Sequence, residues 1–393
     1  MNGPLRPLRD FLVSLKLTVV LLALGLILVF AATLDQVNLG IWGIQEKWFR
    51  SFVVFQTIGG AKVPVFPGGY AIGGLLLLNL IAAHLYRFKF TWKKAGIQLT
   101  HLGVILLLIG ELLSGLWQED YAMRLTEGET KNYSEHHHDN ELVILDTTNP
   151  DYNEVVAIPE SIIARKEPLQ YAKLPFRIVV KDYFPNSSLG MRDAASTAPA
   201  QATAGLGLSV VATREPITYK QDERNMPAAS IELVGASGPI GTWLVCTSFG
   251  PASRAPFLQA PQTFTYEGRT YQIALRFTRT YKPFALTLLK FSHDRYAGTE
   301  IPKNFSSKLR LKSADGREDR EVLIYMNNPL RYAGFTFYQS GYDGEQTTIL
   351  QVVRNPSWQL PYIACLMMTV GLLWQFALHL AGFFAKRRNA AAP

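Results

Sequence analysis

The sequence predicts an integral membrane protein with four transmembrane α-helices and a large, mainly-β extracytoplasmic domain. Long uncharged apolar runs lie towards both ends of the 393-residue chain, while its middle has the composition of an ordinary soluble domain. Clusters of lysine and arginine flank the apolar runs, as topology sorting in membranes produces. The middle segment is a series of short β-branched and aromatic runs separated by turn residues.

Four runs are long enough to cross a membrane, which takes roughly 20 predominantly apolar residues. They span about 11–32, 70–86, 96–117 and 358–385. The apolar stretch of the first run is longer than that of a usual signal peptide, so we expect a membrane anchor. Trp117 and Trp358 fit interfacial aromatic anchors.

The basic clusters predict the orientation of the chain. Lysines and arginines gather at the amino terminus, between residues 87 and 94, and in the tail 386–393. We expect all three regions in the cytoplasm, in a bacterial inner membrane. A short external loop and residues 118–357 then lie on the periplasmic side. Because topology explains these charges, the net charge of +8 does not indicate a nucleic-acid partner.

Residues 118–357 predict an all-β domain, and a division into two packed lobes stays open. The Ala/Thr/Gly/Ser-rich stretch DAASTAPAQATAGLG, residues 193–207, predicts a flexible insertion. Six runs have strand character: ELVILD, FRIVVKDYF, TWLVCTSF, YQIALRFTRTY, EVLIYM and TTILQVV.

Three histidines lie inside the apolar runs, and this is the most chemical feature of the sequence. His84 precedes Arg87 by three residues, His101 follows Lys94 by seven, and His379 precedes Lys386 by seven. At about 1.5 Å per residue, all three are expected roughly 5 to 10 Å inside the cytoplasmic boundary. An ionisable side chain within a span is costly and is therefore a functional hypothesis.

The histidines are candidate axial ligands of haem iron, which neutral imidazole binds. Arg87, Lys89 and Lys93 are candidate contacts for the haem propionates. A simpler interpretation stays open. Histidines near helix ends often bond a backbone carbonyl, and the basic loop satisfies the topology rule by itself.

Other polar groups have weaker functional interpretations. Glu111 could relay a proton or bind a cation, but we favour contact with the outer interface or with a neighbouring helix. Metal binding by EHHHDNE, Glu135 to Glu141, is chemically conceivable, yet its spacing matches no zinc pattern and a solvated loop is favoured. His293 fits either an external site or a turn.

The cysteines argue against redox chemistry. No CxxC or CxxCH occurs, so a thiol-redox enzyme and a c-type cytochrome are both disfavoured. A disulfide between Cys246 and Cys365 is not expected, because only Cys365 lies in an apolar run.

Two stretches in the second half of the chain resemble the ResB (CcsB) family of System II cytochrome c maturation. They are YAGTEIPKNFSSKLRL, residues 296–311, and MNNPLRYAGFTFYQSGYD, residues 326–343, the latter followed closely by the last apolar run. The run SLKLTVVLLALGLILVFAATL is similar to the first span of that family. The order of spans and domain agrees as well, so the resemblance covers nearly the whole chain.

The resemblance implies a haem-handling subunit that works with a ResC (CcsA)-type membrane protein. Such a pair moves haem b, as a substrate, across the membrane and joins it to CxxCH of apocytochrome c. Thiol-reducing membrane proteins are possible further partners. His84 best matches the histidine of the family's haem path, whereas His101 and His379 are candidates from their depth alone.

The resemblance also limits the expected activity. The tryptophan-rich WWD motif belongs to the ResC-type partner and is absent here, so the chain is expected to be an incomplete part of a lyase-type holocytochrome c synthase. Two alternatives stay open: an apocytochrome c chaperone that binds no haem, and a b-type haem electron-transfer protein. Phe335 and Phe337, in the alternating stretch, are expected to fill a core rather than to face haem or apocytochrome.

Overall fold

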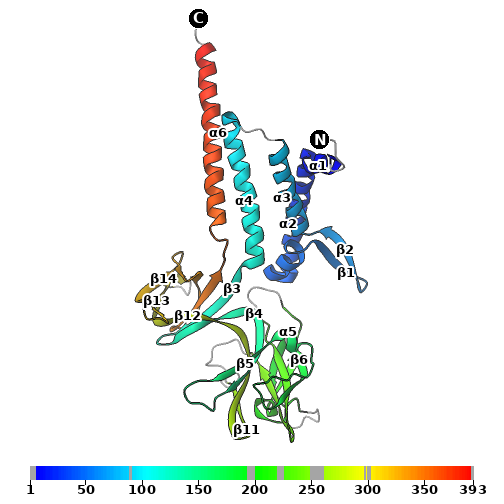
Figure 1. The fold of residues 1–393 in the computed structure, drawn as a ribbon, viewed down its shortest axis with the longest axis vertical. Helices are drawn as coiled ribbons and strands as arrows, with labels where there is room; N and C mark the ends of the chain where they lie inside the picture. Colours follow the sequence, from blue (N-terminus) through cyan, green and yellow to red (C-terminus); the bar gives the residue numbers. More distant parts are fainter. Residues whose placement is uncertain are drawn as a thin grey trace. The chain divides into compact units, whose positions relative to one another are not determined.

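The computed structural model describes residues 6–87, 91–192, 200–218, 225–247, 261–295, 298 and 302–390. The chain divides into two compact units (Figure 1). The helical unit combines the residues before 120 with those after 354, and the β unit holds most of the chain between them. The helical unit is therefore built from both ends of the sequence.

The helical unit contains four helices that are long and apolar enough to cross a membrane, counted over the described residues. This confirms the prediction of four apolar helices. Figure 1 shows α2 beside α3 and α4 beside α6. The helices are α1 (Arg6–Leu12), α2 (Leu15–Ile44), α3 (Gly69–Tyr86), α4 (Ala95–Trp117) and α6 (Leu360–Ala390), with short turns η1 (Gln45–Phe49) and η2 (Trp92–Lys94).

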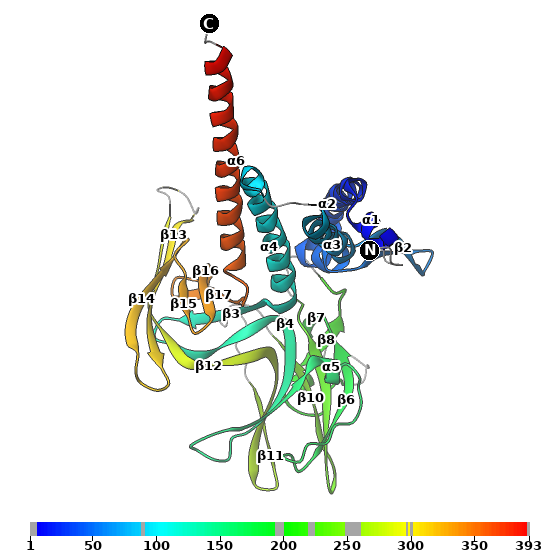
Figure 2. The same ribbon diagram turned by 45° about the horizontal axis from the view of Figure 1, so that its top comes forward.

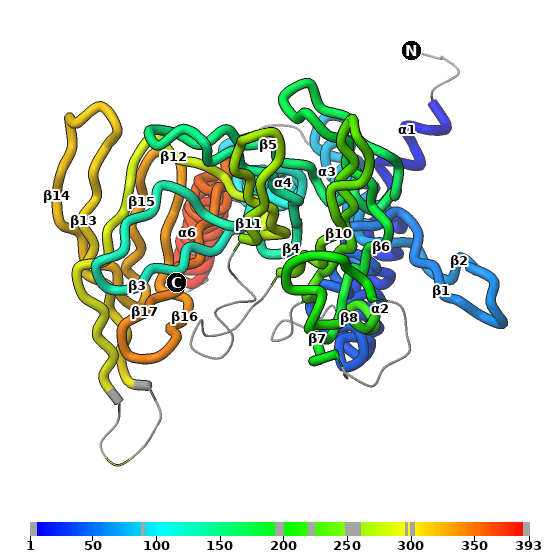
Figure 3. The backbone as a smooth tube through the Cα atoms, turned by 90° about the horizontal axis from the view of Figure 1, so that it is seen from below, coloured from blue at the N-terminus to red at the C-terminus, as the bar shows by residue number. Residues whose placement is uncertain are grey.

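The helix α2 continues beyond the predicted apolar run and bends near its end. Gly40 has φ of 69°, a left-handed conformation that glycine adopts without a Cβ penalty. The Asp35 carboxylate accepts hydrogen bonds from Lys47 Nζ at 2.7 Å and Trp48 Nε1 at 2.8 Å, across this bend. A hairpin of β1 (Val53–Ile58) and β2 (Ala61–Pro67) then leads to α3 (Figure 3).

The helices α4 and α6 pack through glycines that leave room for close backbone contact. A Cβ at Gly371 would lie 2.6 Å from Thr100 Oγ1 and 2.7 Å from the Gly96 carbonyl oxygen. A Cβ at Gly103 would lie 2.6 Å from Met368 Cγ. Small residues at such positions are typical of helix pairs in membranes, where van der Waals contact drives association.

The β unit is built from antiparallel strands, which confirms the mainly-β prediction. In its largest sheet, β4 and β12 lie side by side as two long strands (Figure 2). The strands are β3 (Glu119–Thr126), β4 (Thr130–Asp146), β5 (Glu154–Pro159), β6 (Arg177–Phe184), β7 (Ser187–Met191), β8 (Val210–Arg214), β9 (Ala228–Gly235), β10 (Gly238–Cys246), β11 (Gln262–Tyr266), β12 (Arg269–Arg295), β13 (Pro302–Ser313), β14 (Asp319–Tyr325), β15 (Leu330–Tyr332), β16 (Phe335–Asp343) and β17 (Thr347–Arg354), with a short helix α5 (Glu160–Ile163) and a turn η3 (Gly205–Leu208).

The six predicted runs correspond to β4, β6, β10, β12, β14 and β17, and the last two residues of TWLVCTSF, 248–249, lie outside the described residues. The largest sheet joins strands in the order β14-β13-β12-β4-β3-β17-β16-β15, and β9 lies between β10 and β6 in a separate sheet.

The β unit is one compact unit, and its described residues form three hydrophobic cores. The first core contains Phe176 and Tyr271, the second contains Leu309 and Phe337, and the third, smaller core contains Leu244. The long strand β12 contributes to the first two cores, with Tyr271–Leu275 in the first and Phe284–Phe291 in the second. The two larger cores are therefore joined through a continuous strand.

The aromatic stretch before the last helix packs largely as predicted. Phe337 on β16 is fully buried, and its ring lies 6.0 Å from that of Phe284. Phe335 is half-buried, and the ammonium of the buried Lys282 lies 4.1 Å from its ring centroid. Phe337 thus fills a core, and Phe335 covers a buried cation.

The predicted flexible insertion is partly ordered. Residues 193–199 lie outside the described residues, but the segment after them is packed. Ala202 is buried, and the Gln201 side chain exchanges hydrogen bonds of 2.9 and 2.8 Å with the backbone of Ala212. The composition of this segment predicted flexibility, but its small residues allow close packing instead.

Candidate functional site

Two of the three intramembrane histidine candidates face each other between α3 and α4. The ring centroids of His84 and His101 lie 5.6 Å apart, with 54° between the ring planes. Both side chains are half-buried. The pair therefore forms one site from two helices.

A backbone hydrogen bond fixes the tautomer of each ring. His84 Nδ1 lies 3.2 Å from the Leu80 carbonyl oxygen, and His101 Nδ1 lies 2.7 Å from that of Ile97. A carbonyl oxygen only accepts, so each Nδ1 carries the hydrogen and the lone pair is on Nε2. The hydrogen bond that the simpler interpretation predicted is present, and it orients each ring with Nε2 as the acceptor nitrogen.

The spacing of the pair fits ligation of one metal ion. Nitrogens on opposite sides of a metal ion are about 4 Å apart, since each metal–imidazole bond is about 2 Å. The ring centroids of His84 and His101, 5.6 Å apart, have a separation comparable with that of two imidazoles bound to one metal ion. The residues thus fit a bis-imidazole arrangement such as haem iron accepts.

The third candidate, His379, lies apart from this pair. It is exposed on α6, and its Nε2 lies 3.0 Å from Gln375 Nε2, which donates to it. Among the described residues its ring contacts neither His84 nor His101. The shared depth of the three histidines therefore does not make one three-ligand site in this structure.

The candidate propionate contacts do not form one cluster in the part of the chain that is described. Arg87 Nη1 donates to the Val13 carbonyl oxygen at 3.1 Å, which directs this arginine towards the break between α1 and α2. Lys93 is exposed in η2, and Lys89 lies outside the described residues. Arg87 instead lines a pocket of about 520 Å³ with Arg9 and Lys16.

A buried asparagine beside this site has no counterpart in the sequence-based predictions. Asn79 on α3 is 1% exposed; its side chain donates to the Leu12 carbonyl at 2.6 Å and accepts from Thr18 Oγ1 at 2.6 Å. It also donates to the Ser14 carbonyl at 3.2 Å. Asn79 is the one amide side chain in the apolar run LLLLNLIAAHL, and this isolated position could have indicated a buried polar contact from the sequence. This network ties α3 to the start of α2.

Glu111 is exposed on α4, and among the described residues it makes no hydrogen bond or ion pair. The favoured pairing with a neighbouring helix is therefore not seen within the described chain. Ser114, one turn further along α4, bonds Ser357 Oγ at 3.0 Å and accepts from Asn355 Nδ2 at 3.0 Å. That polar contact joins the carboxyl-terminal end of α4 to the segment before α6.

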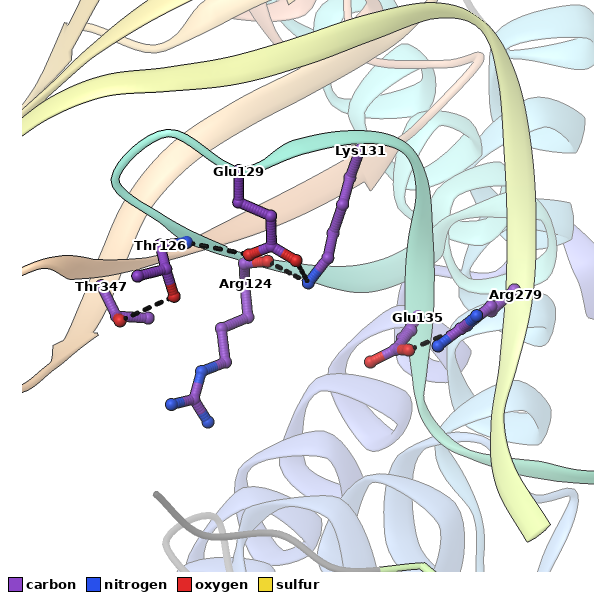
Figure 4. A network of polar contacts seen from close by, with 7 residues as sticks. All are labelled: Arg124, Thr126, Glu129, Lys131, Glu135, Arg279 and Thr347. Atoms are coloured by element: carbon purple, nitrogen blue, oxygen red, sulfur yellow. Dashed lines mark hydrogen bonds and ion pairs between the residues drawn. The ribbon is translucent and has the colours of Figure 1, made fainter. Parts of the chain in front are cut away.

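The favoured interpretation of EHHHDNE as a solvated loop is wrong, because these residues lie within strand β4. Arginines on β12 compensate its acids: Glu135 bonds Arg279 Nε at 3.0 Å, and Glu141 bonds Arg276 Nε at 2.8 Å. Figure 4 shows Glu135 and Arg279 pointing towards each other from neighbouring strands. No group of three or more metal-ligating side chains occurs among the described residues.

The β3–β4 hairpin continues this polar network (Figure 4). Lys131 Nζ bonds the Glu129 carboxylate at 2.9 Å and the Arg124 carbonyl at 2.7 Å, while Thr126 bonds Thr347 at 3.0 Å. These contacts join β3, β4 and β17. The charged side chains of this hairpin therefore stabilise the pairing of its strands.

His293 lies in a strand, and not in a turn. It is on β12, opposite Phe305, and its ring lies 4.9 Å from that of Tyr342 and 5.9 Å from that of Phe291. This aromatic packing accounts for its position without a metal ion.

The four apolar helices and the large β domain are consistent with the class of membrane proteins, and two of these helices carry the histidine pair. The model of the ResB-like family matches residues 259–349, which include β11 to β16. This match confirms the resemblance to the ResB (CcsB) family.

Three curated relatives illustrate the similarity. Protein NrfI of Wolinella succinogenes is 36% identical over 93 residues, which are 23% of this chain and 10% of that protein. Cytochrome c biogenesis protein CcsB of Synechococcus sp. (strain WH7803) is 31% identical over 140 residues, 34% of this chain and 30% of the relative. CcsB of Crocosphaera subtropica is 40% identical over 72 residues, 18% and 15% of the two chains. The matches thus span less than a third of these relatives.

Proposed function

We propose that this chain is a haem-handling subunit of a cytochrome c biogenesis system in the bacterial inner membrane. The names of the CcsB relatives and the ResB-like match support the pathway. The observation that supports haem handling is the closeness of the His84 and His101 rings, which come from two neighbouring helices. The substrate is haem b, and the products are cytochromes c with haem joined at CxxCH.

In the proposed orientation both termini and the loop between α3 and α4 face the cytoplasm, and the β unit faces the periplasm. His84 and His101 then lie near the cytoplasmic end of their helices, where haem enters. Each Nε2 offers a lone pair to the iron, and each Nδ1–H bond to the backbone holds its ring in place. Lys93, exposed at this end, is available to a propionate.

A ResC-type partner with a WWD motif completes the system in this proposal, because the chain has no such motif. The partner takes haem from the histidine pair and holds it at the outer face for thioether formation. The β unit receives apocytochrome c there, and thiol-reducing membrane proteins keep its cysteines reduced.

Haem retention by the purified protein tests the proposal. The chain is produced with a ResC-type partner, and the Soret absorbance per protein is compared for the parent, His84→Ala and His379→Ala. We expect at least about a tenfold loss of haem in His84→Ala, because an axial ligand is removed. His379→Ala, exposed on α6, is the matched control and keeps its haem. Equal haem in all three proteins contradicts the proposal.

A second candidate function is an apocytochrome c chaperone that binds no haem. It is favoured by one observation: the family match lies in the β unit, outside the histidine pair. A colourless complex that binds a CxxCH peptide supports this function. Reduction of bound haem by quinol without covalent product would instead support a b-type electron-transfer protein.

A further inference from the structure

The pocket at the amino-terminal end of α2 is a second site of the helical unit, separate from the histidine pair. It measures about 520 Å³ and lies where α1, α2 and α3 meet. Its walls carry three cations and one carboxylate: Arg9, Lys16, Arg87 and Asp10. Arg9 is already paired with Asp10 at 2.6 Å, so a net charge of about +2 is left to attract an anion.

The contacts of these side chains hold the pocket open without neutralising it. Arg87 Nη1 donates to the neutral Val13 carbonyl at 3.1 Å, which keeps its positive charge. The Arg9 guanidinium lies 5.9 Å from the ring of Tyr86, a cation–π contact. Lys16 makes no hydrogen bond or ion pair with any described residue. The first turn of α2 contains no acidic residue, and its backbone dipole adds to the positive potential.

An apolar surface continues from the pocket along α2. Leu15, Val19, Leu22 and Leu26 follow one another at helical spacing, and they are 67%, 59%, 56% and 76% exposed. Side chains at such spacing share one face of a helix. A cationic pocket beside a long apolar face is the surface that a phospholipid with an anionic headgroup fits.

Haem is the less suitable occupant of this pocket. His84 faces His101 on α4, whereas Arg87 is directed to Val13 at the start of α2. His84 and Arg87 therefore contact different neighbours of α3: His84 contacts α4, and Arg87 contacts the segment before α2. A propionate held by Arg87 would lie away from the helix that supplies the second histidine.

We propose that this pocket binds the phosphate headgroup of an anionic membrane lipid, such as phosphatidylglycerol, whose acyl chains lie along α2. Basic pockets between transmembrane helices bind such headgroups by charge. The lipid covers the break between α1 and α2, which Asn79 also holds from α3. This inference does not depend on haem binding; it requires only that the apolar helices lie in a membrane.

Native mass spectrometry of the purified full-length protein tests the site, with phosphatidylglycerol and phosphatidylcholine supplied in equal amounts. The parent is expected to retain the anionic lipid in at least about tenfold excess, since each basic residue near an anionic headgroup contributes about a factor of five. The variant Lys16→Gln/Arg87→Gln is expected to lose this excess. The matched control Lys93→Gln/Lys94→Gln removes the same charge from η2, outside the pocket, and keeps it.

A single-residue variant and a competition experiment with haemin complete the test. If Arg87→Gln disturbs packing, Lys16→Gln alone is expected to lower the excess about fivefold, because Lys16 has no contact to lose. Added haemin is expected to leave the bound phosphatidylglycerol in place; its displacement would identify haem carboxylates as the ligand and overturn the proposal. Equal retention of both lipids, or an equal loss in the control, would also overturn it.

Discussion

The helical unit and the β unit use the same kinds of side chain for different purposes. In the helical unit, the rings of two histidines on neighbouring helices lie close together, and the Nδ1 atom of each is bonded to a backbone carbonyl. In the β unit, His136 pairs with Asp139 and His293 stacks among aromatic rings. Histidine is a candidate ligand in the first unit and a packing or pairing residue in the second.

The difference shows that the similarity to known proteins and the candidate chemistry lie in separate parts of the chain. The family match covers residues 259–349, inside the β unit. The aromatic residue Phe337 within this match is buried in a core. The matched region therefore supports the resemblance to the ResB-like family, while the candidate ligands lie in the helices.

The largest effect is expected from removing a core aromatic of the β unit. Phe337→Ala should destabilise the protein by about 3–5 kcal/mol, because a fully buried ring leaves a cavity. Tyr338→Ala, next in the strand and 37% exposed, should cost less than about 1 kcal/mol. Pulse proteolysis of the full-length protein measures both. Equal losses would mean that the aromatic stretch is a binding surface and not a core.

A smaller effect is expected at the glycine contact of the helical unit. Gly371→Ala should cost about 1–3 kcal/mol, because its Cβ would meet Thr100 and the backbone of Gly96. Gly382→Ala on the same helix meets nothing within 4 Å and should be neutral or stabilising. Thermal unfolding in detergent compares the two. A stable Gly371→Ala variant would show that α4 and α6 do not pack this closely.

The smallest expected effect concerns the reactivity of the Cys246 thiol in the β unit, and the stability of the protein is not changed in this experiment. Burial raises the pKa of the Cys246 thiol to about 11. At pH 8 its thiolate should therefore be about a hundredfold rarer than that of a thiol with the ordinary pKa near 9, and labelling correspondingly slower. Iodoacetamide labelling in a Cys365→Ser background, with and without denaturant, measures this. Fast labelling of the native protein, or a rate that does not rise from pH 8 to 10, would make Cys246 a candidate for exchange with apocytochrome thiols.

The sequence predicted the apolar helices and six strands because their patterns are local. It failed at EHHHDNE, since the arginines that compensate Glu135 and Glu141 follow more than 130 residues later, on β12. Residue counts gave the shared depth of His84, His101 and His379, but depth does not specify the direction in which a side chain points from its helix. The basic pocket was missed for a similar reason. Arg9, Lys16 and Arg87 meet only because the chain breaks between α1 and α2.

The ligation state of bound haem tests the central claim most directly, namely that His84 and His101 act as a pair. The protein purified with its partner is examined by electron paramagnetic resonance as the parent and as His101→Ala, with His379→Ala as the control. The account predicts a low-spin bis-histidine signal in the parent and the control, and a high-spin signal or lost haem in His101→Ala, restored by added imidazole. An unchanged low-spin signal in His101→Ala would contradict it, because the second ligand would then come from elsewhere.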